Sequence, residues 1–263
     1  HSELEQHSEA VKAAIVTELK TWKHYGCFSR KARRGARNVI DARWVFKWKW
    51  VDGKRVIRAR LTVRGFKDLD ANRVSTFAGT VSRWGQRLIN STAAQFGWKL
   101  GSLDIEKAFL QGLTYEELAA QSGREVREVN FDLPPGSMSL LRRVAGFENF
   151  NPALEVLHCD KPGTGLKDAP QAFNGKLVMV LLGLKLKQVI ADDQLMVWRK
   201  PELVLVMGAH VDDVKFTGED RAIAELVTAL EKVFGKLKVQ EHEFENCGIV
   251  HVQCPRTMAV ETH

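Results

Sequence analysis

The stretch Leu203–Gly218, LVLVMGAHVDDVKFTG, sets two adjacent acidic residues at the end of an apolar run. Residues 203–207 are all apolar, which is typical of a buried strand. Asp212 and Asp213 follow, although like charges side by side repel and a buried strand should exclude both. Two explanations stay open at this point. Asp favours turns because its side chain bonds nearby backbone N–H groups. Alternatively, paired carboxylates become favourable when a divalent cation such as Mg²⁺ lies between them.

The residues on either side of this stretch extend the pattern. After it, residues 220–235, DRAIAELVTALEKVFG, predict an amphipathic helix that ends at Gly235. Its apolar stripe comprises Ile223, Leu226, Val227, Leu230, Val233 and Phe234. Before it, a second acidic pair at Asp192 and Asp193 lacks a long apolar approach, so we predict a loop there.

A third acidic position lies in Trp98–Gly112, WKLGSLDIEKAFLQG, which we predict to run as a strand into a helix. Asp104 lies where the strand ends. A single Asp in that place is usually a helix cap, so the residue alone says little. Phe109 follows five residues later, and by itself it indicates an ordinary core residue that anchors the helix.

Residues 42–66, ARWVFKWKWVDGKRVIRARLTVRGF, predict a β-hairpin because Asp52-Gly53 is a strong two-residue turn signal. A period of two gives one apolar, aromatic-rich face with Trp44, Phe46, Trp48, Trp50, Ile57, Ala59, Leu61 and Val63. The other face carries Lys47, Lys49, Arg58, Arg60 and Arg64. Like charges across a strand pair are unfavourable unless something anionic offsets them. The pattern therefore predicts a face that binds anions, most simply phosphate, with Arg58 and Arg60 foremost.

Residues 163–174, GTGLKDAPQAFN, form a Gly-rich stretch that we predict to open a helix, with Pro170 near its first turn. Gly165 and Lys167 lie in this loop. Helix N-termini present free N–H groups to anions, although loops of this kind are also ordinary connections.

Composition narrows the class of protein. The chain has 263 residues, 44% of them hydrophobic, which is enough for a substantial core in one domain or two lobes. Its formal net charge of +7 suggests a polyanionic partner such as nucleic acid. No apolar run approaches the length of a membrane span, so we expect no membrane partner. Because the chain begins with His1 rather than Met, we expect a fragment of a longer protein.

The four cysteines, Cys27, Cys159, Cys247 and Cys254, form no C-x-x-C pair. No signal peptide precedes them, so we expect reduced intracellular thiols. The loose cluster of His242, Cys247, His251 and Cys254 fits no common zinc spacing, which argues against a metal site there.

Five short motifs follow one another along the chain: RARLTVRGF, LDIEKAFLQG, LPPG, GLKDAPQAFN and HVDD. Together they resemble the reverse transcriptase domain of copia-type LTR retrotransposons, a segment of the Pol polyprotein. The resemblance runs from about Trp22 to about Val250. Each motif alone is weak, but five in the right order with compatible spacing are hard to obtain by chance.

The resemblance implies an α+β fold, namely a right-hand polymerase. Its antiparallel palm sheet is backed by helices, and it carries a fingers hairpin and the start of a thumb. On this basis residues 1–263 are expected to form one reverse transcriptase domain. Residues 1–97 would be mostly fingers, 98–219 palm with a fingers insertion, and 220–263 the palm helix and the start of the thumb.

The resemblance also implies an RNA-directed DNA polymerase, a nucleotidyltransferase. Its acidic motifs match at Asp104, Asp212 and Asp213, which would be catalytic and would hold two Mg²⁺ ions, or Mn²⁺ in their place. The residues expected to bind the incoming nucleotide are Arg58, Arg60, Phe109, Gly165 and Lys167. Phe109 would place its ring under the sugar and exclude a 2′-hydroxyl. Partners would be an RNA template, a DNA primer, deoxyribonucleoside triphosphates and other Pol segments, in the cytoplasm or the nucleus.

Three positions depart from the family pattern. His210 and Thr164 stand where an aromatic residue and Tyr are usual, and Asp168 stands where Gln is usual. A carboxylate at 168 is expected to repel a triphosphate nearby. These departures leave open an alternative, a catalytically decayed retrotransposon remnant that only binds nucleic acid. A metal-dependent nuclease using the same three carboxylates is a third possibility, but it gives the hairpin and the Gly-rich loop no role.

Overall fold

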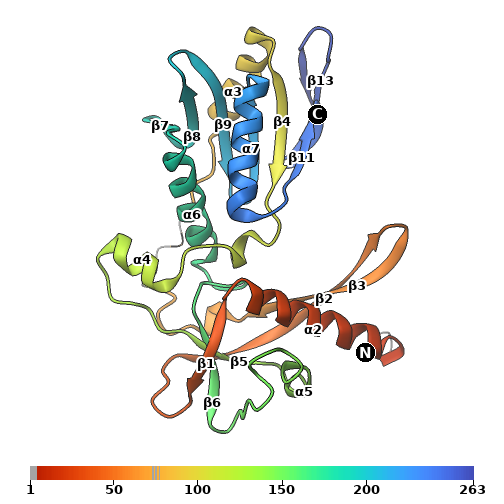
Figure 1. Ribbon diagram of the computed structural model, residues 1–263, viewed down its shortest axis with the longest axis vertical. Helices are drawn as coiled ribbons and strands as arrows, with labels where there is room; N and C mark the ends of the chain where they lie inside the picture. Colours follow the sequence, from red (N-terminus) through yellow and green to blue (C-terminus); the bar gives the residue numbers. More distant parts are fainter. Residues whose placement is uncertain (1–4, 73, 75, 77) are drawn as a thin grey trace. The chain divides into compact units, whose positions relative to one another are not determined.

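The computed structural model of the chain describes residues 5–72, 74, 76 and 78–263. Its chain divides into two compact units, each built from two separate segments. The first unit comprises His1–Thr76 and Gly112–Ala172, and the second comprises Phe77–Gln111 and Phe173–His263. Both units contain helices as well as strands (Figure 1). This division groups residues 78–97 with the second unit; the assignment of residues 1–97 mostly to fingers, which the resemblance implies, stays a prediction.

The first unit contains a five-stranded sheet. Its strand order is β1 (Phe28–Ala32), β6 (Glu155–Cys159), β5 (Asn130–Asp132), β2 (Val39–Val51) and β3 (Lys54–Val63). The pairing of β2 with β5 is parallel, and the other pairings are antiparallel. Shorter elements of this unit are η1 (Gly65–Lys67), α4 (Tyr115–Ser122) and α5 (Met138–Leu141).

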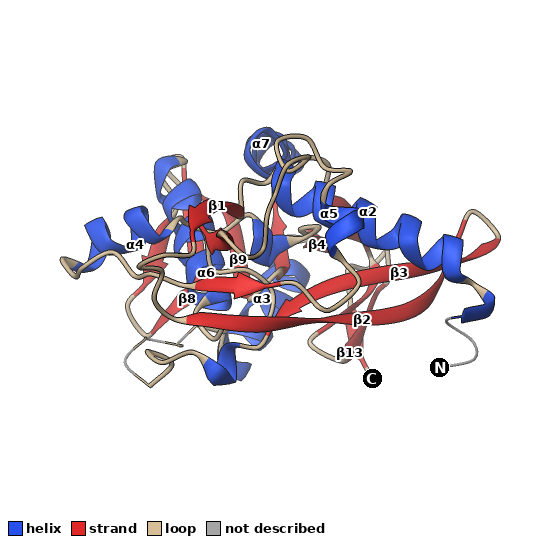
Figure 2. Cartoon of the chain, turned by 90° about the horizontal axis from the view of Figure 1, so that it is seen from below, coloured by secondary structure: helices blue, strands red, loops and turns tan. Residues whose placement is uncertain are grey.

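The long β2–β3 hairpin turns at Asp52 and Gly53, which both have positive φ. The sequence predicted this hairpin from the same two residues. The helix α2 (Ser8–His24) runs alongside it, as Figure 2 shows, and packs against β3. Leu19 and Leu61 are fully buried in this region of the unit. One face of the hairpin is therefore covered along part of its length.

The second unit contains a six-stranded antiparallel sheet. Its strand order is β11 (Lys238–Glu241), β4 (Lys99–Asp104), β10 (Asp213–Gly218), β9 (Leu203–His210), β8 (Asp192–Arg199) and β7 (Lys187–Val189). A separate three-stranded sheet of β12 (Glu243–Asn246), β13 (Ile249–Gln253) and β14 (Val260–Thr262) follows.

Helices cover both faces of the six-stranded sheet, because its strands alternate apolar residues to either side. On one face Leu103 and Val214 join a core with α6 (Ala169–Gly183) and α7 (Asp220–Phe234), and Figure 1 shows α7 lying across β4 and β9. On the other face Leu100 and Val206 join a smaller cluster with α3 (Arg83–Phe96). The predicted helix at 220–235 thus supplies one side of the main core.

Two local predictions were wrong. Residues after Asp104 do not form an α-helix: a short 3₁₀ helix, η2 (Ala108–Leu110), follows Lys107, whose φ of +56° is left-handed. The pair at Asp192 and Asp193 does not form a loop but begins β8. Asp192 accepts hydrogen bonds from the backbone N–H groups of Ser82 and Gln194, so it serves a structural contact.

Candidate functional site

A tight turn carries the acidic pair of the opening stretch. Asp213 pairs with His210 across β9 and β10, so Val211 and Asp212 form a two-residue connection. Val211 has a φ of +58°, a left-handed conformation that costs a β-branched residue about 1–3 kcal/mol. The surrounding sheet holds this turn in place. Observed strain of this kind is often found at functional sites.

The structure brings the three predicted catalytic carboxylates together within the second unit. Asp104 ends β4 and pairs directly with Asp213 on the neighbouring strand β10. Directly opposite residues point to the same face of a sheet, so the two side chains share one side. The backbone N–H of Ile105 donates to the carbonyl of Asp212 at 3.4 Å, which keeps the turn beside the end of β4.

Burial and the charge of neighbouring carboxylates change the proton affinity of Asp104 and Asp213. The pKa of Asp104 is raised, first because neighbouring groups shield it from water and then because Asp212 and Asp213 repel its charge. Lys238, opposite Asp104 on β11, acts in the other direction. The pKa of Asp213 is raised by burial and further by Asp212. A bound cation would relieve this repulsion.

The donor chemistry of the three carboxylates fits a hard divalent cation. In the part of the chain that the structure describes, however, no group of three or more His, Cys, Asp or Glu side chains is already placed to hold a metal ion. The carboxylates suit a cation by charge and by atom type.

Lys215 is a member of this site that the sequence reasoning missed. It follows Asp213 by two residues on β10 and therefore lies on the same face. Its side chain is fully buried, and its Nζ donates to Gln86 O at 3.1 Å and to Asn90 Oδ1 at 2.9 Å, both on α3. Burial lowers its pKa to about 8. A lysine in the middle of an otherwise apolar strand was the available signal.

Phe109 lies in η2 of the second unit, close in sequence to Asp104. Its side chain is partly buried and packs against the core cluster that contains Leu103 and Phe173. This contact agrees with the role of an anchoring core residue. A role beside a nucleotide sugar stays a prediction.

The predicted nucleotide-binding residues Arg58 and Arg60 lie on β3 of the first unit. Both are exposed, whereas the alternate residues Ala59 and Leu61 are buried. Arg58 lies opposite Lys47 across the hairpin. Within the described residues neither arginine has an acidic partner, whereas Arg64 of the same face forms an ion pair with Asp41. The predicted alternation of an apolar and a cationic face is confirmed here.

The Gly-rich loop packs directly on the end of β3. The N–H of Val63 donates to the carbonyl of Thr164 at 2.9 Å. Gly165 has a φ of +99°, and a Cβ there would lie 2.2 Å from Val63 O, so only glycine fits. Lys167 is exposed on the same loop. The structure thus joins Gly165 and Lys167 to the strand that carries Arg58 and Arg60.

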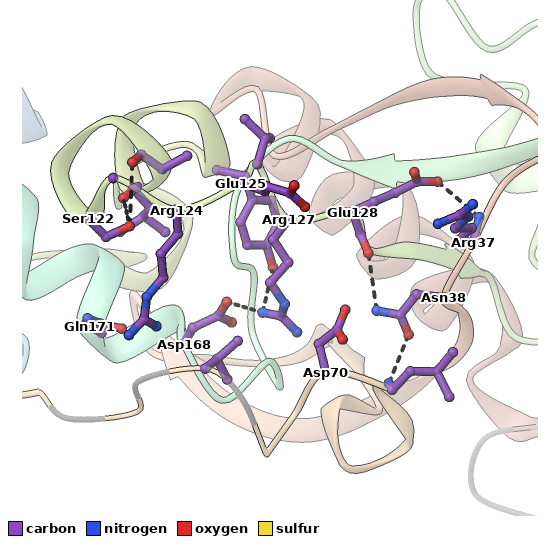
Figure 3. A pocket seen from close by; sticks show the side chains of 17 residues that line it. Arg37, Asn38, Asp70, Ser122, Arg124, Glu125, Arg127, Glu128, Asp168 and Gln171 are labelled. Carbon is purple, nitrogen blue, oxygen red and sulfur yellow. Dashed lines mark hydrogen bonds and ion pairs between the residues drawn. The ribbon is translucent and has the colours of Figure 1, made fainter.

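Asp168 does not present a free charge. It is buried, and Arg127 forms ion pairs with both Asp168 and Asp68, as the close-up in Figure 3 shows for Asp168. The ring of Tyr115 also lies near the Arg127 guanidinium. The expectation that Asp168 would repel a nearby triphosphate stays a prediction, but the carboxylate has a partner, and one guanidinium offsets only one of the two carboxylate charges. The sequence did not indicate the pairing of Asp168 with Arg127, because the two residues lie 41 positions apart.

A cavity of ≈ 870 Å³ lies beside this ion-pair network within the first unit (Figure 3). Arg37, Arg124 and Arg127 line it together with Asp70, Glu125 and other residues. Cations and carboxylates are mixed on its walls, so its charge selects no particular class of ligand.

Comparison with known proteins supplies a separate line of evidence. The chain is 27% identical over 208 residues to the retrovirus-related Pol polyprotein from transposon RE2 of Arabidopsis thaliana, and 26% identical over 208 residues to that from transposon RE1. It is 25% identical over 228 residues to the corresponding protein from transposon TNT 1-94 of Nicotiana tabacum. The chain is similar to transposon Pol polyproteins.

These matches cover 78% to 84% of this chain but only 13% to 15% of the relatives, so the chain spans a small part of their length. No protein-family model matches the sequence. Among the described residues, none of the helices combines the length and apolar character that crossing a membrane requires.

Proposed function

We propose that this chain is the reverse transcriptase segment of a copia-type Pol polyprotein, an RNA-directed DNA polymerase with a right-hand fold. The observation that carries the proposal is the pairing of Asp104 with Asp213, beside the turn that holds Asp212. The ordered sequence motifs and the similarity to transposon Pol polyproteins support it.

In the proposed reaction a primer 3′-hydroxyl loses its proton and attacks the α-phosphate of a deoxyribonucleoside triphosphate, so that a phosphodiester bond forms and pyrophosphate leaves. Asp104 and Asp212 would hold two Mg²⁺ ions, and Asp213 would support them from the adjacent position. When bound, the ions stabilise the charge that develops on the attacking and leaving oxygens. The strand ends of β4, β9 and β10 fix the backbone of the three carboxylates, so little reorganisation is needed there.

The exposed cations of the first unit would bind the triphosphate. Arg58 and Arg60 present uncompensated guanidinium groups, whose planar donors match phosphate oxygens. Gly165 allows the loop to approach β3 closely, and Lys167 adds a cation from that loop. The RNA template and the DNA primer would be contacted mainly through their phosphates. Phe109 would lie under the sugar of the nucleotide.

The alternative is a remnant that binds nucleic acid without catalysis. The unusual residues Thr164 and His210 favour it. The pairing of Asp168 with Arg127 weakens the argument from the Asp168 charge but does not cancel it, because Arg127 also pairs with Asp68.

Primer extension separates the two functions. The protein is mixed with a labelled DNA primer on an RNA template, the four deoxyribonucleoside triphosphates, and Mg²⁺ or Mn²⁺. A polymerase lengthens the primer, and binding is measured in parallel by fluorescence anisotropy. Binding without any extension in either metal would favour the remnant.

A further inference from the structure

The turn between β12 and β13 reaches the carboxylate site of the second unit. Asn246 pairs with Ile249, so Cys247 and Gly248 form a two-residue connection. Both have positive φ, +55° and +75°, as in the tight hairpin turns that follow the twist of the strands. The backbone N–H of Cys247 donates to Oδ2 of Asp213 at 3.4 Å.

Asn246 adds a second contact from the same turn. Its side chain is 1% exposed, and Gln86 Nε2 donates to its Oδ1 at 3.3 Å. Because Gln86 Nε2 is a donor, the Asn246 atom that it contacts is the amide oxygen. The Nδ2 donor of Asn246 is therefore left for another partner. Nδ2 is buried and meets no acceptor at full hydrogen-bond geometry within the described residues. The side chain nevertheless lies close enough to Asp213 to lower the pKa of that carboxyl by hydrogen bonding.

The turn is anchored firmly to the rest of the second unit. Phe244 on β12 is buried in the cluster that includes Leu100, and its ring stacks on His251 with centroids 5.1 Å apart. Gln253 Oε1 accepts a hydrogen bond from the Leu100 N–H at 2.8 Å. These contacts fix the β12–β13 hairpin against β4, the strand that ends at Asp104. A positioning role requires this kind of rigid support.

We propose that the Asn246–Gly248 turn positions Asp213, with the Cys247 N–H holding its Oδ2 and the buried Asn246 amide as a further donor from the same turn, so that the other oxygen is left for a cation shared with Asp104 and Asp212. This inference rests on the proposed function of the three carboxylates. Hydrogen bonds from neighbouring groups orient metal ligands in many proteins, and their loss typically lowers metal affinity about 10–100-fold.

Mn²⁺ binding to the whole 263-residue chain tests the proposal without any measurement of activity. Titration calorimetry compares the wild type with Asn246→Ala and with the matched control Glu245→Ala, whose side chain is exposed on the same strand. Asn246→Ala should lower the affinity about 10–100-fold, and Glu245→Ala should leave it near the wild type. A thermal melt of each variant shows that it is folded.

A second measurement needs no metal. Amide hydrogen exchange at Cys247 should be faster in Asp213→Ala, which removes the acceptor, and unchanged in Asp104→Ala. The positioning role is overturned if Asn246→Ala binds Mn²⁺ with the same affinity as Glu245→Ala. It is also overturned if the amide of Cys247 exchanges at the same rate in Asp213→Ala as in the wild type. The proposed function stands in both cases. If the wild type binds no Mn²⁺, the proposed function fails, and the metal-presenting part of this inference fails with it.

Discussion

Asp212 lies at the centre of the strained turn between β9 and β10, next to the two other carboxylates. Replacing it with Asn keeps the shape of the side chain but removes the charge that would hold a cation. In primer extension, Asp212→Asn should lose at least about a thousandfold in rate, equivalent to about 4 kcal/mol of barrier. Asp193→Asn is the matched control because Asp193 belongs to the other acidic pair. Near-normal extension by Asp212→Asn would remove Asp212 from the mechanism.

Phe109 has two candidate roles that one substitution separates. Phe109→Val shortens the side chain and should open space for a 2′-hydroxyl if the ring lies under the sugar. The measurement is the ratio of deoxyribonucleotide to ribonucleotide use, each as kcat/KM, and the ratio should fall sharply. A variant that keeps deoxyribonucleotide activity with an unchanged ratio would show that Phe109 is only a core anchor.

Arg127 is the shared ion-pair partner of two buried carboxylates, Asp68 and Asp168. Arg127→Ala would leave both without their cation, and breaking a buried ion pair from one side typically costs about 3–5 kcal/mol. The free energy of unfolding, measured in urea, should fall by that order. Arg124→Ala, an exposed neighbour, should change it little. An equal small effect of the two variants would show that the network contributes nothing to stability.

At the residue scale, the sequence located the acidic residues but not the groups that surround them. Asp212 and Asp213 stood out because they follow an apolar run, whereas Asp104 was assigned through the resemblance to reverse transcriptases. Lys215, Arg127 and Asn246 did not, since their partners lie on other elements and no local pattern brings them together. Contacts of this kind depend on tertiary packing, which a single sequence does not display.

At the element scale, the β2–β3 hairpin has a face on which phosphate binding can be tested. Arg60→Ala should weaken binding of the nucleotide more than binding of the template, because Arg60 lies on β3 near the Gly-rich loop. Lys54→Ala, at the turn end of the same face, serves as the control. Nucleotide affinity comes from the apparent KM, and template affinity from fluorescence anisotropy. Equal losses in both would indicate a general contact with nucleic acid instead.

Elements with strong local signals were predicted well. Asp52-Gly53 placed the hairpin turn, and the apolar stripe with Gly235 placed α7. The helix expected after Asp104 failed because Lys107 adopts a left-handed conformation there, and no sequence rule required that of a lysine. The small β12–β14 sheet was not predicted, because its short strands carry little periodicity.

At the scale of the whole molecule, acid sensitivity should reflect Glu128. The Lys31 side chain and then the Arg37 N–H lower the pKa of this carboxyl from 4.5 to about 2. A lowered carboxyl pKa stabilises the fold above about pH 4.5, and that stabilisation is lost as the pH falls toward 2. Urea midpoints between pH 6 and pH 2 should therefore fall less steeply in Glu128→Gln than in the wild type. Glu125→Gln, an exposed neighbour, should follow the wild type; parallel curves for all three would contradict the assignment.

The division into two units could not be predicted from the order of the residues, because each unit draws on segments far apart in the chain. The resemblance to reverse transcriptases supplied the expected right-hand polymerase fold, and that fold stays a prediction. Without that resemblance, the residues predicted only local features. These were an apolar strand that ends at acidic residues, a hairpin with a cationic face and a helix that covers a sheet.

The interleaved order of the second unit also governs when it can assemble during synthesis. A ribosome makes β4 early, yet both strands that pair with it, β10 and β11, are translated only after the intervening residues 112–172 and several further elements. Until then β4 has two unpaired edges, which are open to incorrect pairing with other chains. A nascent chain interrupted before Asp213 therefore carries Asp104 on a strand without its neighbours, and such truncated products should aggregate rather than accumulate as a half-formed enzyme.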